Sequence, residues 1–272
     1  MELKEAIGLR RSVRYLDPER PVERTKIQKM LEAARRASHW GNVQSLRAVV
    51  VERATAPKEV IDSLEAYVGN FQMKIAPVVI VWYLDAQSVD EQPDRLREIV
   101  EARAMGIDLQ ETRDRLERVI IPFFEHLTDV LKSPGMSEVD CGQGIAQATL
   151  VAFEEGLGTC LLGSAKTAEL ISYLGLPDQA RILVLQTVGY PAEDVYKAGQ
   201  RPRLPLRADL PPEPLQRAVP TRRRHGQGAR RRGSDPVRGA RRHGAPRQGA
   251  GRPAGEVRLP AALAAAGCPR RC

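Results

Sequence analysis

The sequence predicts an α+β fold, and three observations support this prediction. Helical and extended patterns follow one another without the regular strand–helix–strand rhythm of a doubly wound sheet. The β-branched runs at 47–51 and 76–83 are typical of buried strands. Apolar residues at helical spacing recur before and after these runs. A chain of 272 residues with 42% hydrophobic content is long enough to bury a core around such elements.

The amino-terminal elements are two amphipathic helices. We expect the first over 3–11, with Leu3 and Ile7 on one face. The second covers 22–38, where apolar residues stand at i, i+3, i+4 and i+7 (Ile27, Met30, Leu31, Ala34). Two prolines in "YLDPERPV" interrupt the pattern between them. The arginine-rich stretch "RRSVRYLDP" at 10–18 therefore falls where the first helix passes into a turn.

The remaining elements follow the first strand in order. We expect a helix over 57–71, a long helical excursion over 91–132 and a helix over 141–156 that ends at Gly156. Strands at 159–163 and 182–191 come next, separated by a short helix at 167–174. The helix over 141–156 carries small residues that predict very close packing (Gly142, Gly144, Ala146, Ala148).

The net charge of +8 belongs entirely to the end of the chain. Residues 211–272 hold 15 Arg, no Lys and 3 acids, whereas residues 1–210 hold 27 basic and 31 acidic residues. Arg, Ala, Gly and Pro make up 44 of those last 62 residues, a composition that buries too little apolar area to offset chain entropy. We therefore expect a folded domain over 1–210 and a tail over 211–272 that is disordered or derived from a frameshift.

Several classes of protein are disfavoured. The longest apolar run, at 76–84, is short for a membrane span, and the amino terminus lacks the apolar core of a signal peptide, so we expect a cytoplasmic protein. The four cysteines show neither zinc-ligand spacing nor a small secreted framework. The stretch "GQGIAQ" at 142–147 fails as a dinucleotide fingerprint because no strand precedes it and Gln147 replaces the third glycine. We assign no catalytic side chain and no metal ligand.

The arginine cluster at 10–14 has two interpretations. Cations suit a helix C-terminus, so the cluster is compatible with a solvated helix end. Three forked donors and a hydroxyl at one turn are also what a phosphate monoester requires. Composition alone leaves both interpretations open.

Four motifs in register resolve this choice through a resemblance. They are "RRSVRYLDP", "WGNVQSLRAVVV", "GIAQATLVAFEEGLGTCLLG" and "VGYPAED" with the later "RPRLPL". Across residues 1–210 the chain resembles the flavin-dependent nitroreductase family. The resemblance implies a mixed, mainly antiparallel sheet flanked by helices, in an intertwined homodimer.

The resemblance also implies the residues that bind the cofactor, FMN. Its phosphate and ribityl end would lie on Arg10, Arg11, Ser12 and Arg14, with Arg201 and Arg203 closing on the same phosphate. The turn of Ser38, His39, Trp40 and Asn42 would reach the flavin of the other subunit, although this chain has Ser38-His39 and Ser45-Leu46 where the family usually has Pro-Ser and Pro-Trp. The backbone of Leu162 and Gly163 would face flavin N5, and Asn70 would touch the ring edge.

The implied activity is an FMN-dependent oxidation of NADH or NADPH that reduces a nitroaromatic, quinone or similar electron-poor acceptor by ping-pong hydride transfer. The 91–132 excursion would roof the pocket. Reductive dehalogenation or flavin fragmentation on the same fold is one alternative. The other is a nucleic-acid-binding protein that acts through the basic tail, although the tail has no aromatic residues for base stacking.

Overall fold

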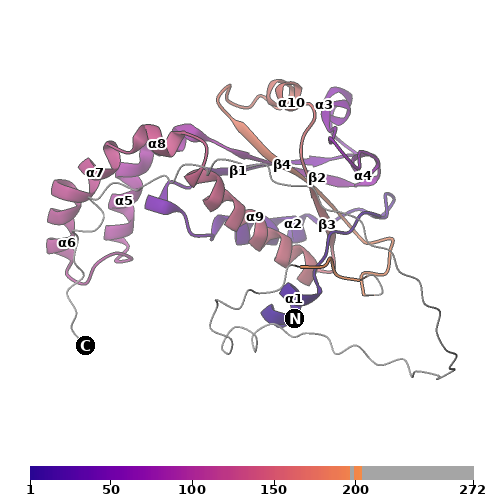
Figure 1. Cartoon of the computed structure of the whole chain (residues 1–272), viewed down its shortest axis with the longest axis horizontal. Helices are drawn as coiled ribbons and strands as arrows, with labels where there is room; N and C mark the ends of the chain where they lie inside the picture. Colours follow the sequence, from indigo (N-terminus) through magenta and orange to yellow (C-terminus); the bar gives the residue numbers. More distant parts are fainter. Residues whose placement is uncertain (197–198, 204–272) are drawn as a thin grey trace, which may run out of the picture. The chain divides into compact units, whose positions relative to one another are not determined.

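The computed structural model describes residues 1–196 and 199–203, which form a four-stranded sheet with helices on both faces (Figure 1). The strands are β1 (Leu46–Glu52), β2 (Val78–Leu84), β3 (Gly158–Leu162) and β4 (Arg181–Gly189), in the order β1-β2-β4-β3. Every neighbouring pair is antiparallel. The predicted α+β fold and its four strands are confirmed. The predicted tail over 211–272 lies outside the described residues.

The alternation of side chains along β2 divides the core between two helix layers. Val78, Ile80 and Trp82 pack with α2 (Arg24–Arg35) and α9 (Met136–Glu154). Val79 and Val81 point to the opposite face, as the two-residue period of a strand requires. There they pack with α3 (Lys58–Ser63), α4 (Phe71–Ile75) and α10 (Thr167–Tyr173). Figure 1 shows these two helix layers on opposite sides of the sheet.

The predicted helical excursion is confirmed, but it consists of short helices. These are η2 (Ala86–Glu91), α5 (Gln92–Glu101), α6 (Leu109–Arg115), the π-helical η3 (Leu116–Ile120), α7 (Ile121–Glu125) and α8 (Thr128–Lys132). They share a small core of their own around Leu96, Val100, Leu116 and Ile121. The excursion is therefore a packed subdomain attached between β2 and α9.

The single helix predicted over 57–71 is wrong, because the chain between α3 and α4 leaves the helical path. Residues 65–67 run antiparallel to 163–165, with a bridge between Ala66 and Ser164. The Tyr67 N–H donates to the Gly163 carbonyl at 3.2 Å, and the Ala165 N–H donates to Glu65 at 2.7 Å. Backbone bonds to a distant segment thus replace the local helical bonds.

The first helix, α1 (Leu3–Leu9), forms as predicted, but its apolar face is uncovered. Leu3 is 65% exposed and Ile7 is 55% exposed, and Ala6 is the one buried residue of the helix. An amphipathic helix normally gains most of its stability by burying that face. The two exposed side chains therefore mark a surface that this single chain does not use.

The small residues of α9 divide between two faces. Gly144 and Ala148 are buried, and a Cβ added at Gly144 would lie 2.6 Å from Leu46 Cδ2 and 3.0 Å from the Ala34 carbonyl oxygen. Close packing at Gly144 is thus within the chain, against α2 and the start of β1. Gly142 and Ala146 are exposed instead.

Candidate functional site

A small cavity of about 60 Å³ brings the two predicted basic clusters together. One wall comes from the loop after α1, with Arg10, Arg11, Ser12 and Arg14. The other comes from the segment that follows β4, which contributes Gly199, Gln200, Arg201 and Arg203. We call this the arginine cavity. The structure therefore places all six predicted phosphate-binding residues around one space.

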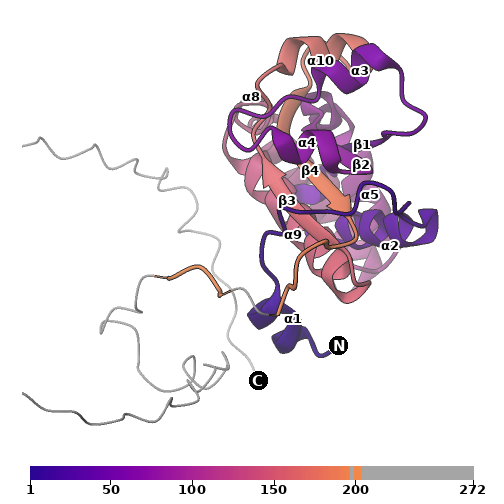
Figure 2. The same cartoon turned by 90° about the vertical axis from the view of Figure 1, so that its right-hand side faces the viewer.

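Backbone bonds to the end of the sheet hold the loop after α1 in place. The Val13 N–H donates to the Thr159 carbonyl of β3 at 2.9 Å, and Leu16 bridges to Pro191. The Asp17 N–H donates to the Tyr190 carbonyl at 2.8 Å. Figure 2 shows this loop passing beside β3, with the segment after β4 returning towards α1.

Gln200 fixes the second wall of the arginine cavity. Its Nε2 atom lies within 2.8–3.1 Å of three carbonyl oxygens, those of Gly8, Leu9 and Arg10. These carbonyls belong to the end of α1, where the last turn of a helix leaves acceptors without intrahelical donors. One side chain thus caps α1 and brings Arg201 and Arg203 to the loop. Gln200 was not predicted from the sequence, although its position directly before Arg201 is a usable signal.

The arginines of the cavity differ in how they are engaged. The Arg11 guanidinium bonds the carbonyls of Val195 and Asp194, both at 3.1 Å, and the carboxylate of Glu193 at 3.3 Å. Arg10 and Arg14 are half-buried, and neither side chain has a hydrogen bond or ion pair to another described residue. Guanidinium groups that line a shared cavity without a protein partner can donate charge-assisted hydrogen bonds to an anion. Arg10 and Arg14 therefore fit a bound anion such as a phosphate.

Cys160 lies beside the loop of the arginine cavity and stays neutral. Burial raises the pKa of its thiol, while Arg14, the Ser12 hydroxyl and Arg201 oppose the shift. A reactive cysteine needs a lowered pKa. Cys160 is therefore a packing residue next to the cavity and not a nucleophile.

Exposed apolar side chains lie next to the arginine cavity. Tyr15 directly follows Arg14, and its ring lies 5.5 Å from that of Phe71 on α4. Tyr67 packs beside Gly163, where an added Cβ would be 3.3 Å from its ring. Tyr15, Tyr67 and Phe71 are 56%, 76% and 42% exposed. A cationic cavity bordered by exposed rings suits a ligand with an anionic end and a flat ring system.

The structure brings three further predicted residues to this border. Gly163 is exposed at the end of β3, whereas the Leu162 side chain is buried in the core, so only its backbone can face a ligand. The Asn70 Oδ1 atom accepts the Ala66 N–H at 3.2 Å, and Ala66 bridges to Ser164. Asn70 and Gly163 thus lie on neighbouring segments. The Asn70 carbonyl oxygen is engaged, which leaves its amide group for a ligand.

The turn of residues 38–42 lies elsewhere in the chain. Asp140 of α9 accepts the Trp40 N–H at 2.6 Å, and the Asn42 side chain donates to the Arg95 carbonyl at 3.4 Å. The Trp40 ring packs on Phe124 at 5.0 Å. Ser38 is exposed, and His39 is half-buried. Within the described residues of one chain, this turn contacts α5, α7 and α9, and it does not meet the arginine cavity.

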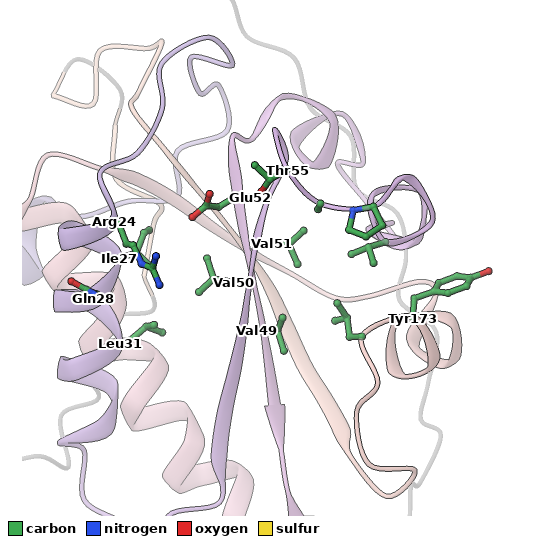
Figure 3. A pocket seen from close by; sticks show the side chains of 14 residues that line it. Arg24, Ile27, Gln28, Leu31, Val49, Val50, Val51, Glu52, Thr55 and Tyr173 are labelled. Atoms are coloured by element: carbon green, nitrogen blue, oxygen red, sulfur yellow. The ribbon is translucent and has the colours of Figure 1, made fainter.

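Larger cavities lie elsewhere on the described chain, among them one of about 410 Å³ lined by Pro18, Glu52 and Arg53 and two that lie along the edge strand β1. Of these two, one of about 630 Å³ is lined by α2, β1 and α10, with Leu31, Val50 and Tyr173 among its walls (Figure 3). The other, of about 370 Å³, includes His39, Arg47 and Trp82. Size alone favours these grooves, but none gathers unpaired cations as the arginine cavity does. We therefore place the candidate site at the arginine cavity.

Two further searches concern metals and membranes. Among residues 1–196 and 199–203, no group of three or more His, Cys, Asp or Glu side chains is placed to hold a metal ion. Within the same ranges, no helix has both the length and the apolar character needed to cross a bilayer.

Comparison with known proteins agrees with the fold and the motifs. The sequence pattern of the nitroreductase family matches residues 7–190. A NADH dehydrogenase of Thermus thermophilus is 30% identical over 206 residues, which are 76% of this chain and 93% of that protein. A CLA biosynthesis enone reductase from Lactiplantibacillus plantarum is 26% identical over 213 residues, 76% of this chain and 91% of that protein. This chain belongs to the nitroreductase family.

A solved structure shows the same fold. It is a protein of Exiguobacterium sibiricum described as a nitroreductase in complex with FMN, with a TM-score of 0.63 and 24% identity over 75% of this chain and 94% of that chain. At this identity the likeness shows the fold alone. The predictions of the family and of an oxidoreductase are confirmed.

Proposed function

We propose that this protein is an FMN-dependent NAD(P)H oxidoreductase that reduces an electron-poor acceptor. The observation that supports it most is the pair of half-buried guanidinium groups, Arg10 and Arg14, facing a small cavity without a carboxylate partner among the described residues. The FMN bound by the Exiguobacterium protein and the name of the Thermus relative support the cofactor and the electron donor.

In this proposal the arginine cavity binds the phosphate of FMN. Arg10, Arg14, Arg201 and Arg203 supply charge-assisted donors, and Ser12 supplies a hydroxyl. Arg11 holds the loop after α1 in place instead of binding the phosphate, since its guanidinium already bonds Glu193 and two carbonyls. The flavin ring would then be held on the side of Gly163, where Leu162 and Gly163 would offer backbone amides and Asn70 would offer its amide group.

When bound, FMN supplies the redox chemistry, because it accepts a hydride from NADH or NADPH and passes reducing equivalents to the acceptor in a second half-reaction. The residues of the site orient the cofactor and neutralise its phosphate. No histidine or carboxylate is among the described residues that line the arginine cavity, and both carboxylate oxygens of Glu193, which bonds the loop after α1, accept hydrogen bonds. The protein therefore contributes positioning and electrostatics, and we assign no side chain as acid or base.

We propose a homodimer as the active form. The described chain exposes Met136 and Val139 on α9 beside Gly142 and Ala146, and it exposes Leu3 and Ile7 on α1. Exposed apolar side chains on neighbouring helices are typical of an interface. A second subunit would also give the 38–42 turn a role, because Ser38, His39, Trp40 and Asn42 could then border the partner's flavin.

The acceptor is proposed as a class only: a nitroaromatic, a quinone or a related electron-poor compound such as an enone. The enone reductase among the relatives favours conjugated carbonyl compounds within this class. The helical excursion lies against the 38–42 turn, since the Gln92 side chain donates to the Gly41 carbonyl at 3.3 Å. In a dimer it would then border the acceptor pocket. Dehalogenation and flavin fragmentation are other reactions of the same proposed site, and the tail of the nucleic-acid alternative lies outside the described residues.

The experiment compares Arg14→Ala with the wild type for binding of FMN and of riboflavin, which lacks the phosphate. A lost charge-assisted bond costs about 1.5–3 kcal/mol, so the FMN dissociation constant should rise roughly ten- to hundredfold. Riboflavin binding should not change. Arg36→Ala is the control, because Arg36 is exposed on the far end of α2 and pairs only with Glu32 among the described residues. Equal FMN affinity in all three proteins would refute the phosphate site.

A further inference from the structure

We propose that Glu193 is a positioning residue that gives the arginine cavity its selectivity for a phosphorylated flavin over an unphosphorylated one. This inference rests on the proposed function, because it concerns the same cavity. Glu193 lies in "GYPAED", four residues after β4 ends at Gly189. Its carboxylate reaches across to the loop after α1, about 180 residues earlier in the sequence.

The carboxylate of Glu193 holds the backbone of that loop. Oε1 accepts the Arg14 N–H at 2.8 Å and the Tyr15 N–H at 3.4 Å. Two adjacent amides on one oxygen fix the peptide from which the Arg14 side chain departs. The Ala192 N–H returns a bond to the Tyr15 carbonyl at 2.9 Å, so the two segments are bonded in both directions.

The second oxygen of the carboxylate binds Arg11. Oε2 lies 3.3 Å from Arg11 Nη2, and the Arg11 side chain is only 10% exposed. The same guanidinium bonds the carbonyls of Asp194 and Val195, so it fastens the turn that carries Glu193 to the loop. Although burial opposes ionisation, the bonds from Arg14, Tyr15 and Arg11 hold the pKa of Glu193 below its usual value. Arg11 and Glu193 thus form an ion pair without net charge that links the loop after α1 to the segment after β4.

Because of this ion pair, Arg11 and Arg14 have different roles although they belong to one motif. The Arg11 side chain is bonded within the protein, whereas Arg14 is held by its backbone and keeps its side chain available to the cavity. A side chain that is already placed loses less conformational freedom when the anion binds. Because the carboxylate is neutralised by Arg11 and by two amides, it places the loop with little repulsion of the phosphate.

A direct electrostatic effect would have the opposite sign. If Glu193 acted mainly as a negative charge near the cavity, its removal would strengthen binding of an anion. If it acted only in folding, its removal would weaken phosphorylated and unphosphorylated flavins alike. The positioning role predicts a loss confined to the phosphorylated ligand, and these three outcomes can be told apart.

The test measures dissociation constants of FMN and riboflavin for the full-length apoprotein, for Glu193→Ala and for Glu193→Gln. Glu59→Gln is the matched control, because Glu59 is exposed on α3, away from the cavity. We expect Glu193→Ala to weaken FMN binding about tenfold and to leave riboflavin binding within about twofold. Glu193→Gln should lose less, since its amide oxygen still accepts the Arg14 N–H but cannot pair with the charge of Arg11.

Two results would overturn the proposal: a parallel loss of both flavins, or FMN binding that is unchanged or tighter in the Glu193 variants. If Glu193→Ala does not fold, the nearly isosteric Glu193→Gln provides the test, again through the ratio of the dissociation constants of FMN and riboflavin. A wild type that binds riboflavin as tightly as FMN has no phosphate site. That result would reject the proposed function in the wild-type measurement, before any variant is compared.

Discussion

His39 is a half-buried imidazole whose Nδ1 atom has no hydrogen-bond partner among the described residues. Burial lowers its pKa, and Arg47 adds to the shift while Asp140 opposes it. In the unfolded chain His39 takes up a proton near pH 6.5, whereas in the folded chain it does so only at a lower pH. The folded chain with a neutral His39 therefore keeps its full stability above pH 6.5, and it loses stability as the pH falls from 6.5 towards the lower pKa of the folded state.

We predict that the melting temperature of the wild type falls between pH 7.5 and pH 5.5 and that His39→Gln reduces this fall. His126→Gln is the control, because His126 is exposed on the excursion. Thermal unfolding at the two pH values measures the difference. An equal fall in the wild type and in His39→Gln would show that the imidazole is not responsible.

For single residues, the sequence predicted six of the side chains around the arginine cavity but not how each of them is used. The motif at 10–14 and the later "RPR" motif predicted the residues around the arginine cavity. The structural role of Arg11 depends on the carbonyl groups of Asp194 and Val195, which lie 183 and 184 residues away in the sequence, so no local pattern reveals it. Glu193 was missed for the same reason, since its partners become neighbours only when β4 is in place.

The contact between α9 and α2 depends on Gly144. An added methyl group there would lie 3.0 Å from a backbone oxygen of Ala34, which cannot move without shifting α2. We predict that overpacking in Gly144→Ala lowers the free energy of unfolding by about 1–3 kcal/mol. The higher helix propensity of Ala offsets up to ~1 kcal/mol of this loss. Gly142→Ala is the matched control on the same helix, since an added methyl meets nothing within 4 Å.

Denaturant unfolding of these two variants measures the difference in free energy. Gly142→Ala should be neutral or more stable than the wild type, and Gly144→Ala should be less stable. Equal changes in the two variants would show that the close approach of α9 to α2 is not as tight as described.

At the element scale, periodicity predicted the strands and the long helices because their own side chains determine them. It failed over 57–71, where a predicted helix is replaced by α3, an extended segment and α4. The Tyr67 N–H donates to the Gly163 carbonyl and the Ala165 N–H donates to the Glu65 carbonyl, and such distant partners are set by tertiary structure. It also could not show that Leu3 and Ile7 would be uncovered, because spacing defines an apolar face without naming what packs on it.

For the whole molecule, the exposed face of α9 predicts a dimer. Val139 is 64% exposed, so Val139→Glu should cost the single chain little but should place a charge in the proposed interface. We expect the wild type to be a dimer by light scattering and Val139→Glu to shift towards the monomer. Ile107→Glu is the control, because Ile107 is fully exposed on the excursion. A wild-type monomer that retains FMN would contradict the dimer and the role of the 38–42 turn.

If the arginine cavity holds the phosphate of a flavin mononucleotide, the purified protein should carry that cofactor. The measurement is the visible absorption spectrum of the purified protein, followed by identification of the flavin released on denaturation. We expect a yellow protein that releases FMN and not FAD, with one flavin per chain. A colourless protein whose spectrum does not change after added FMN would contradict this expectation.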